Sequence, residues 1–191
     1  MIKRVRGKVM KDQERWFNSF LGIRQFHSYW MYKVIDDILN ENEQIKGIIE
    51  IGTSRGALSL FLGLECYERG FKSLLTYDIR ARVEPKLFNL LGIKYIIRDC
   101  FNGISIEEIK EYIADIPIFF MCDGGNKIKE FNYFTGLLKQ DSIIAAHDWG
   151  REIKLEDILD ITNKYNMEAL HEEEWDIPPD YIKTCFWRKM K

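Results

Sequence analysis

The chain lacks any apolar run long enough to span a bilayer. Its 191 residues are 46% hydrophobic and 30% charged, and the charges interrupt the apolar stretches. A transmembrane helix needs about 20 consecutive apolar residues. The basic start of the chain also contains no apolar segment that resembles a signal peptide. The sequence therefore predicts a cytoplasmic protein without a membrane partner.

Cysteine is scarce and scattered. The four cysteines are Cys66, Cys100, Cys122 and Cys185, and they form no Cys-x-x-Cys pair. This spacing argues against a zinc site of the usual kind and against a disulfide scaffold. A reducing compartment is the simplest interpretation.

A strong charge of either sign is missing as well. The 28 basic residues nearly balance the 30 acidic ones, and the net charge is -2. Because nucleic-acid-binding domains usually carry a basic surface, this balance argues against a nucleic-acid partner. The local exception is the basic cluster from Lys3 to Lys11, which we interpret as a solvated tail.

Internal repeats, low-complexity segments and Pro/Gly-rich linkers are absent too. The length fits a single domain. We expect that domain to cover residues 1–191, with an N-terminal helical region at 1–45 and an α/β core at 46–191. The aromatic residues of the first region, among them Trp16, Phe17 and Trp30, are expected to pack against the core.

The most informative feature of the chain is an apolar strand followed by a glycine turn. Residues 48–51 read as a buried strand, and the turn runs from Gly52 to Gly56. Apolar residues then recur at helical spacing from Ala57 onwards. Glycines in such a turn allow a ligand to approach the backbone closely, and the helix start offers free N–H groups.

Strands and helices alternate along the rest of the chain. We expect further strands at 73–77, 95–98, 116–122, 142–146, 167–171 and 181–187. Ser105 and Glu108 match a capping box before one of the helices. This alternation predicts an α/β fold with a mainly parallel sheet covered by helices on both faces.

Acidic residues follow four successive strands of this predicted sheet. They are Asp78, Asp99, Asp123 and Asp148. In parallel α/β sheets, ligands bind beyond the carboxyl ends of the strands. Four carboxylates at that edge indicate a functional site rather than ordinary solvated loops.

The pattern Glu50-x-Gly52-x-x-x-Gly56 resembles the first motif of class I S-adenosylmethionine (SAM) methyltransferases. It departs from the dinucleotide fingerprint Gly-x-Gly-x-x-Gly, because Ser54 occupies the middle position. The resemblance implies a Rossmann-like three-layer sandwich whose seven-stranded, mostly parallel sheet has an antiparallel last strand. It also implies SAM as cofactor and the following cofactor-binding residues: Glu50, Gly52, Thr53, Ser54, Gly56, Asp78, Asp99, Cys100 and Asp123.

A narrower resemblance is to the cephalosporin-hydroxylase-like and macrocin O-methyltransferase group. It is carried by Gln25 with Tyr29 and Trp30, by Glu50-Ile51-Gly52-Thr53, by Asp123-Gly124-Gly125 and by His147-Asp148. The group holds a divalent metal after strands four and five. The resemblance implies Asp123, His147 and Asp148 as ligands of Mg²⁺, or of Mn²⁺ because His147 supplies nitrogen.

The same comparison leaves the catalytic base open. Asn126 stands where the group often has a catalytic histidine, and an amide is no base. His147 could take a proton, and Lys127 could do so if burial lowered its pKa. We therefore keep His147, Lys127 and Asn126 as candidate catalytic residues.

The predicted function is metal-assisted O-methylation of a small hydroxylated molecule by SAM. One alternative is a domain that binds SAM, S-adenosylhomocysteine (SAH) or a nucleotide without transferring a methyl group. An RNA methyltransferase is a further alternative, weakened by the lack of a basic patch. The acceptor is not defined by the sequence, and a homo-oligomer could complete its pocket.

Overall fold

The computed structural model describes residues 19–25, 27–83, 85–175 and 182–191. Both the basic cluster before Lys11 and the pair Trp16-Phe17 lie outside these ranges. Within them, none of the helices is long and apolar enough to cross a membrane.

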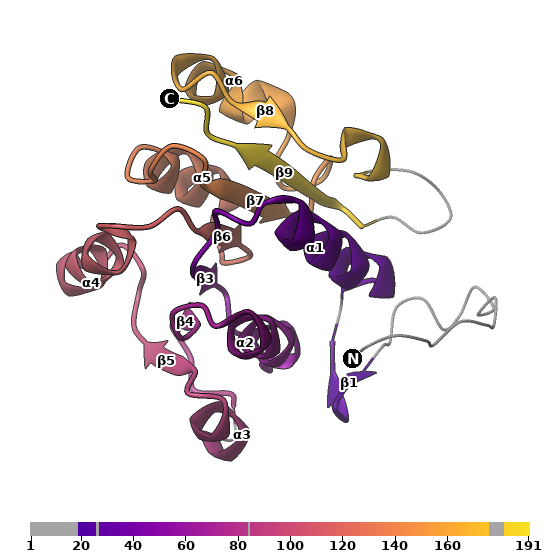
Figure 1. The fold of residues 1–191 in the computed structure, drawn as a ribbon, viewed down its shortest axis with the longest axis vertical. Helices are drawn as coiled ribbons and strands as arrows, with labels where there is room; N and C mark the ends of the chain where they lie inside the picture. The colour runs from indigo at the N-terminus through magenta and orange to yellow at the C-terminus, as the bar shows by residue number, and fades with distance from the viewer. Residues whose placement is uncertain (1–18, 26, 84, 176–181) are drawn as a thin grey trace.

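The centre of the fold is a seven-stranded sheet in the order β5-β4-β3-β6-β7-β9-β8 (Figure 1). All neighbours are parallel except that β9 runs antiparallel to both β7 and β8. The prediction of a mostly parallel sheet with an antiparallel last strand is confirmed. The strands are β3 (Ile48–Ile51), β4 (Leu75–Asp78), β5 (Lys94–Ile97), β6 (Phe119–Cys122), β7 (Ile143–His147), β8 (Glu168–Ala169) and β9 (Thr184–Arg188).

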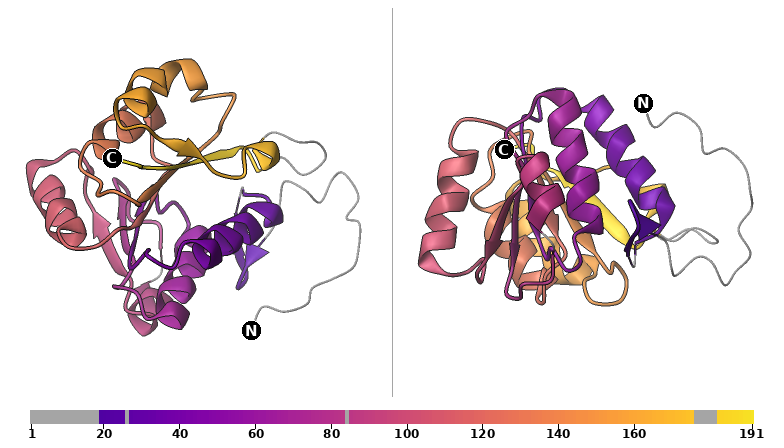
Figure 2. Two further views of the ribbon diagram at one scale, coloured as in Figure 1. Left: turned by 45° about the horizontal axis from the view of Figure 1, so that its top comes forward. Right: turned by 90° about the horizontal axis from the view of Figure 1, so that it is seen from below.

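Helices cover both faces of the sheet. They are α1 (Tyr29–Glu41), α2 (Ala57–Arg69), α3 (Pro85–Leu90), α4 (Gly103–Ile113), α5 (Lys127–Thr135), α6 (Leu155–Lys164) and the short 3₁₀ helix η1 (Glu172–Glu174). Figure 2 shows α1 and α2 on one face and α4 on the opposite face. This is the three-layer arrangement that the alternating pattern predicts.

The two central strands are buried along their whole length. Every residue of β3 and β6 is buried, and Ile51 pairs with Cys122 at their carboxyl ends. A strand covered on both faces needs an uninterrupted apolar run, which explains why the sequence of β6 is Phe-Phe-Met-Cys. Glu50 is the exception in β3, and its polar surroundings are described below.

Some local predictions need correction. The capping box at Ser105 and Glu108 is wrong, because α4 begins at Gly103 and Asn102 caps it by accepting a hydrogen bond from the Ile104 N–H at 3.0 Å. Ser105 is buried inside the helix. The last two strands are shorter than predicted, and β8 contains only Glu168 and Ala169.

A small hairpin precedes α1, where we expected helices alone. Its strands β1 (Ser19–Phe20) and β2 (Ile23–Arg24) pair antiparallel. Phe20 fixes it to the core, since its ring centroid lies 5.8 Å from that of Tyr32 in α1 and 6.0 Å from that of Phe61 in α2. The hairpin thereby brings the segment before α1 over the carboxyl edge of the sheet.

Candidate functional site

The carboxyl ends of the central strands meet as the sequence predicts. The Gly52 N–H donates to the Tyr77 carbonyl at 2.8 Å, and the Asp123 N–H donates to the Ile51 carbonyl at 2.9 Å. Asp78 and His147 end their strands, and Asp123 and Asp148 follow theirs directly. The polar side chains after β3, β4, β6 and β7 therefore share one edge.

The two glycines of the turn are needed for the fold itself, in addition to any role in ligand binding. Gly52 has φ of +101°, and a Cβ there would collide with the carbonyl oxygen of Asp123. Gly56 has φ of +85°, and a Cβ there would contact the Phe88 ring at 2.8 Å. Side chains at both positions would thus be strained and would clash.

Asp78 links the end of β4 to this turn. Its Oδ2 accepts a hydrogen bond from the Ser54 N–H at 2.7 Å, and its Oδ1 accepts one from the Arg80 N–H at 2.9 Å. Each carboxylate oxygen has a second lone pair. Asp78 can therefore hold the turn and still accept hydrogen bonds from ligand hydroxyls.

Glu50 lies below the turn and is fully buried. Its Oε2 accepts hydrogen bonds from the hydroxyls of Ser59 and Thr76. Its Oε1 is also buried and has no hydrogen-bond partner among the described residues. Burial raises the pKa of Glu50 to about 7, despite the two hydroxyl donors.

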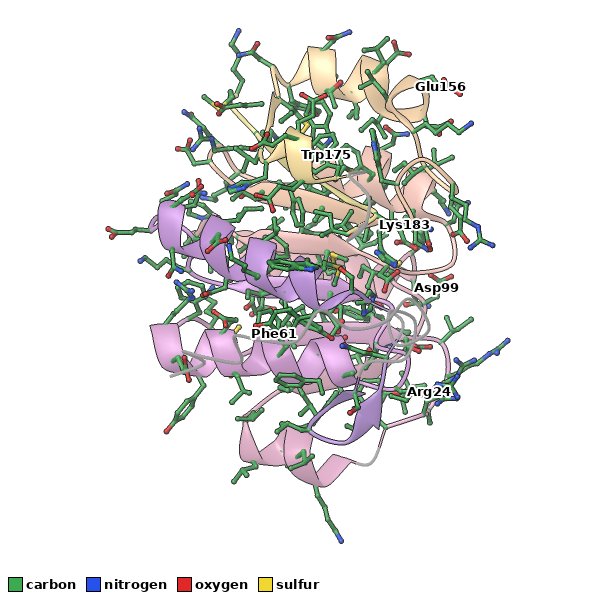
Figure 3. All side chains as sticks on the ribbon, turned by 90° about the vertical axis from the view of Figure 1, so that its right-hand side faces the viewer. Arg24, Phe61, Asp99, Glu156, Trp175 and Lys183 are labelled. Carbon is green, nitrogen blue, oxygen red and sulfur yellow. The ribbon has the colours of Figure 1, made fainter. Side chains whose placement is uncertain are left out.

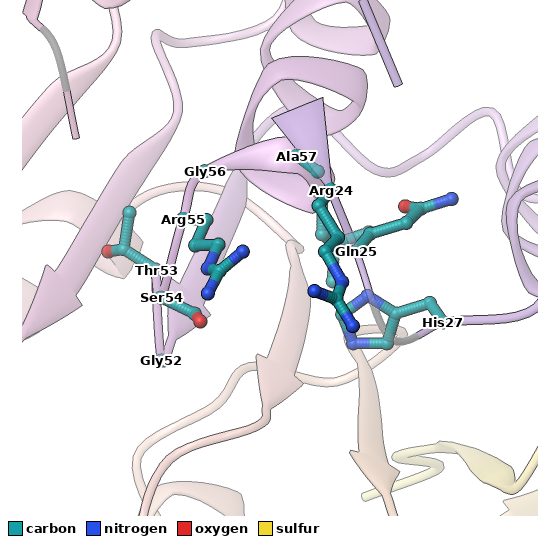
Figure 4. Close-up of a pocket in the computed structure, with 10 residues that line it drawn as sticks. Arg24, Gln25, His27, Gly52, Thr53, Ser54, Arg55, Gly56 and Ala57 are labelled. Atoms are coloured by element: carbon teal, nitrogen blue, oxygen red, sulfur yellow. The ribbon is translucent and has the colours of Figure 1, made fainter. Parts of the chain in front are cut away.

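A pocket opens between the glycine turn and the segment before α1 (Figure 4). The pocket is partly open to solvent. Arg24, Gln25 and His27 form one wall, and the turn from Gly52 to Ala57 forms the other. Thr53, Ser54 and Gly56, which the resemblance implies as cofactor contacts, therefore line a pocket.

The two remaining cofactor candidates follow β5. The Asp99 Oδ1 accepts the Phe101 N–H at 2.9 Å, and this bond shapes the loop before α4. Cys100 is buried, and burial raises the pKa of its thiol to about 12. In Figure 3, Asp99 and Arg24 lie on the same side of the molecule, and Phe61 lies farther from that side, on α2.

His27 is a site residue that the sequence analysis missed. Its Nε2 lies 2.9 Å from the Asp123 Oδ2, across 96 positions of the chain. Its ring centroid lies 4.6 Å from that of His147. One ligand atom from each of His27, Asp123 and His147 falls within 4.8 Å of the others. The available signal was that the chain has three histidines, of which two meet here.

His147 contacts the last strand through its Nδ1. This atom lies 2.9 Å from the Thr184 hydroxyl, which also reaches the Ile182 carbonyl at 2.9 Å and Met31 Sδ at 3.2 Å. When the hydroxyl donates to the carbonyl it accepts from the Nδ1–H, and this tautomer leaves a lone pair on Nε2. Burial lowers the pKa of His147 below its ordinary value, so this imidazole is neutral at pH 7.

Lys127 is a buried cation among carboxylates at the start of α5. Its Nζ lies 2.9 Å from Glu152 Oε2, 3.2 Å from Asp148 Oδ2 and 3.8 Å from Asp123 Oδ1. Burial alone would lower the pKa of Lys127, but these carboxylates outweigh burial and raise it. Lys127 therefore keeps its proton, contrary to what a general base requires.

The chain has the fold of class I SAM-dependent methyltransferases. This follows from solved structures that share the sheet and helices just described. The apo form of CmcI matches with a TM-score of 0.65 at 13% identity, over 91% of this chain and 76% of that one. CmcI with Mg and SAM matches with a TM-score of 0.64 at 14% identity, over 91% and 77%.

A third match is the O-methyltransferase TomG from Streptomyces achromogenes in complex with SAM. Its TM-score is 0.53 at 14% identity, over 86% of this chain and 81% of that one. No family model matches the sequence, and no curated protein matches it either. The likeness therefore concerns the fold.

Two positions distinguish this methyltransferase fold from the motif of the cephalosporin-hydroxylase-like group. Asn126, at the place of the group's histidine, is exposed and caps α5 by accepting the Lys129 N–H at 3.0 Å. The imidazole beside Asp123 comes instead from His27.

An all-oxygen Mg²⁺ site does not fit these residues. Mg²⁺ prefers hard oxygen ligands, but one oxygen of Asp123 and one of Asp148 face the Lys127 ammonium. His147 Nε2 lies 3.9 Å from Asp148 Oδ1, and the ligand atoms that gather with Asp123 are imidazole nitrogens. Burial alone would raise the pKa of Asp123, but the imidazoles and Lys127 outweigh it and hold that pKa below its ordinary value.

Proposed function

We propose that this protein is a SAM-dependent O-methyltransferase that acts on a small hydroxylated molecule with the help of a divalent cation. One observation carries the proposal. The glycine turn after β3 and the carboxylate at the end of β4 are joined by the bond between Ser54 and Asp78, within a fold shared with SAM-bound O-methyltransferases.

The cofactor would lie over the glycine turn, with Asp78 accepting hydrogen bonds from its ribose hydroxyls. When bound, it supplies a methyl group on a positively charged sulfur. Glu50 Oε1, which has no partner among the described residues, would offer a further polar contact beneath the turn. Asp99 and Cys100 would border the adenine.

The residues after β6 and β7 would handle the acceptor. In methyl transfer the acceptor oxygen attacks the methyl carbon, the carbon–sulfur bond breaks, and the acceptor proton leaves. Alignment and an ionised acceptor are the main requirements. The neutral His147 has an Nε2 lone pair at this edge, available either for the proton or for a cation that ionises the acceptor.

A second candidate function is the binding of SAM, SAH or a nucleotide without methyl transfer. Two observations favour it. Asn126 is occupied as a helix cap and Lys127 is a cation, so neither provides a base. In addition, Arg24 and Arg55 border the pocket on opposite sides, which would attract an anionic group.

Methyl transfer from radiolabelled SAM to a panel of hydroxylated acceptors separates the two functions. The reactions should be run with the chelator-treated protein and after addition of Mg²⁺ or Mn²⁺. Label transfer that depends on a divalent cation would support the O-methyltransferase. Saturable SAH binding with no transfer in any reaction would favour the binding module.

A further inference from the structure

We propose that His27, Asp123 and His147 form a binding site for a transition-metal ion, with Mn²⁺, Fe²⁺, Co²⁺ or Zn²⁺ preferred over Mg²⁺. The proposal deepens the proposed function, and it rests on that function only for the use made of the ion. The binding itself is argued from the geometry of the three side chains.

The three side chains come from three separate parts of the fold. His27 precedes α1, Asp123 follows β6, and His147 ends β7. Their ligand atoms lie within 4.8 Å of one another, and His27 Nε2 is 2.9 Å from Asp123 Oδ2. Two metal–ligand bonds of about 2.1 Å at a right angle separate their donors by about 3.0 Å. The observed spacing therefore suits two ligands of one ion.

The neighbours of His147 prepare it for this role. Metal-bound histidines usually donate their second ring N–H to a fixed acceptor, which orients the ring. The Thr184 hydroxyl can be such an acceptor, because the Ile182 carbonyl is within reach of its own proton. The Nε2 lone pair is thus directed by a contact that lies outside the cluster.

Among the described residues, the hydrogen bond of the His27 side chain is to Asp123, within the cluster. The Nδ1 of His27 is buried and has no hydrogen-bond partner among the described residues. Its ring is therefore placed by Asp123 through Nε2 and by the edge contact with His147. Both of these partners belong to the proposed site.

Lys127 divides the carboxylates into two groups. Its ammonium lies beside Asp148 Oδ2, Glu152 Oε2 and Asp123 Oδ1. These three carboxylate oxygens therefore already have a cation from the protein itself. Asp123 directs its other oxygen, Oδ2, to His27. Asp148 therefore pairs with Lys127, and the third proposed ligand, beside Asp123 and His147, is His27.

The donor set determines the class of metal. Two imidazoles and one carboxylate suit non-haem iron, manganese, cobalt or zinc, whereas Mg²⁺ prefers oxygen alone. The four cysteines are all buried, so thiolates do not compete for the ion. A second group, His171 with Glu173 and Glu174, also has suitable spacing, and the test below includes it.

The test is titration of tag-free, chelator-stripped protein with Co²⁺, followed by visible absorption and calorimetry in the absence of SAM. Mg²⁺ in large excess is the competitor. The proposal expects one tightly bound Co²⁺ per chain that Mg²⁺ does not displace. H27Q and H147Q should each weaken Co²⁺ binding about 100-fold or more, because loss of a ligand should cost at least as much as the roughly 10–100-fold that follows loss of an outer-shell partner.

One variant serves as the control. H171A removes the third histidine and should bind Co²⁺ within a few-fold of the unaltered protein. The proposal is overturned if H27Q binds Co²⁺ normally, if H171A is the variant that loses binding, or if Mg²⁺ displaces Co²⁺. The preference for Co²⁺ over Mg²⁺ is measured on the unaltered protein. The proposal can therefore fail on that measurement even if a variant does not fold.

SAH binding of the same preparation keeps this inference separate from the proposed function. Intact SAH binding without Co²⁺ binding would remove the metal site and leave the cofactor proposal standing. Co²⁺ binding without SAH binding would support the metal site and count against the methyltransferase.

Discussion

The backbones of Gly52 and Asp123 meet at the carboxyl edge of the sheet, so closely that a Cβ on Gly52 would overlap the Asp123 carbonyl oxygen. This contact joins the glycine turn of the proposed cofactor site to the strand end that carries the proposed metal ligand. The two halves of the site are therefore fixed relative to each other.

The first prediction is that G52A destabilises the fold severely. The substitution adds a clash with the backbone at a residue of positive φ. We therefore expect the free energy of unfolding to fall by more than about 3 kcal/mol. Urea unfolding measures it. G103A is the matched control, because Gly103 begins α4 and has open space around it. That variant should be neutral or gain up to about 1 kcal/mol. Equal stabilities of the two variants would contradict the packing described.

The second prediction concerns Lys127. K127M would leave Asp123, Asp148 and Glu152 without their shared cation. We expect the free energy of unfolding to fall by about 3 kcal/mol at pH 7. This is the lower end of the range for a broken buried ion pair, because Glu152 is partly exposed. K110M removes an exposed lysine paired with Glu107 and should leave the unfolding midpoint nearly unchanged. An unaltered midpoint for K127M would show that the ammonium does not hold this cluster.

The third prediction is a pH dependence that arises from Glu50. Burial raises its pKa to about 7 from the model-peptide value of 4.5. The folded state therefore binds the proton more tightly, and the stability that this provides is lost as the pH rises from about 4.5 to about 7. E50Q stays neutral, and its amide oxygen can still accept from Ser59 and Thr76.

The measurement is the difference in unfolding free energy between E50Q and the unaltered protein. We expect a gain for E50Q of less than about 1 kcal/mol at pH 5 and of about 3 kcal/mol at pH 8. E43Q, at an exposed position, controls for the loss of a negative charge. A difference that does not change with pH would mean that Glu50 is not the buried acid described.

The fourth prediction is that D78N lowers affinity for SAH about tenfold or more. Asn retains one acceptor oxygen of the two that Asp78 offers, so it cannot serve both the turn and a pair of ribose hydroxyls. Calorimetry measures the affinity, and circular dichroism checks the fold. D115N, at an exposed position before β6, should bind SAH normally. Normal binding by D78N would remove Asp78 from the cofactor site.

Much of the fold could be predicted because its signals are local. The apolar run of β3, the turn at Gly52 and the helical spacing after Ala57 are all read within a dozen residues. The carboxylates after β4, β6 and β7 follow from the same strand positions. Strand ends were less certain, since tertiary packing decides where a strand such as β8 stops.

The rest depended on contacts between distant segments. The hairpin at Ser19–Arg24 has strands of two residues, too short to produce a visible alternation. His27 reaches Asp123 across 96 positions, which no local pattern reveals. The capping box at Ser105 failed for a different reason, because the chain caps α4 three residues earlier, at Asn102.

The most direct test of the central claim is calorimetric titration of the unaltered protein with SAH, with and without added divalent metal. We predict saturable binding of one SAH per chain in both conditions, because the proposed cofactor contacts at the glycine turn and Asp78 do not require the ion. No detectable binding in either condition would contradict the methyltransferase proposal.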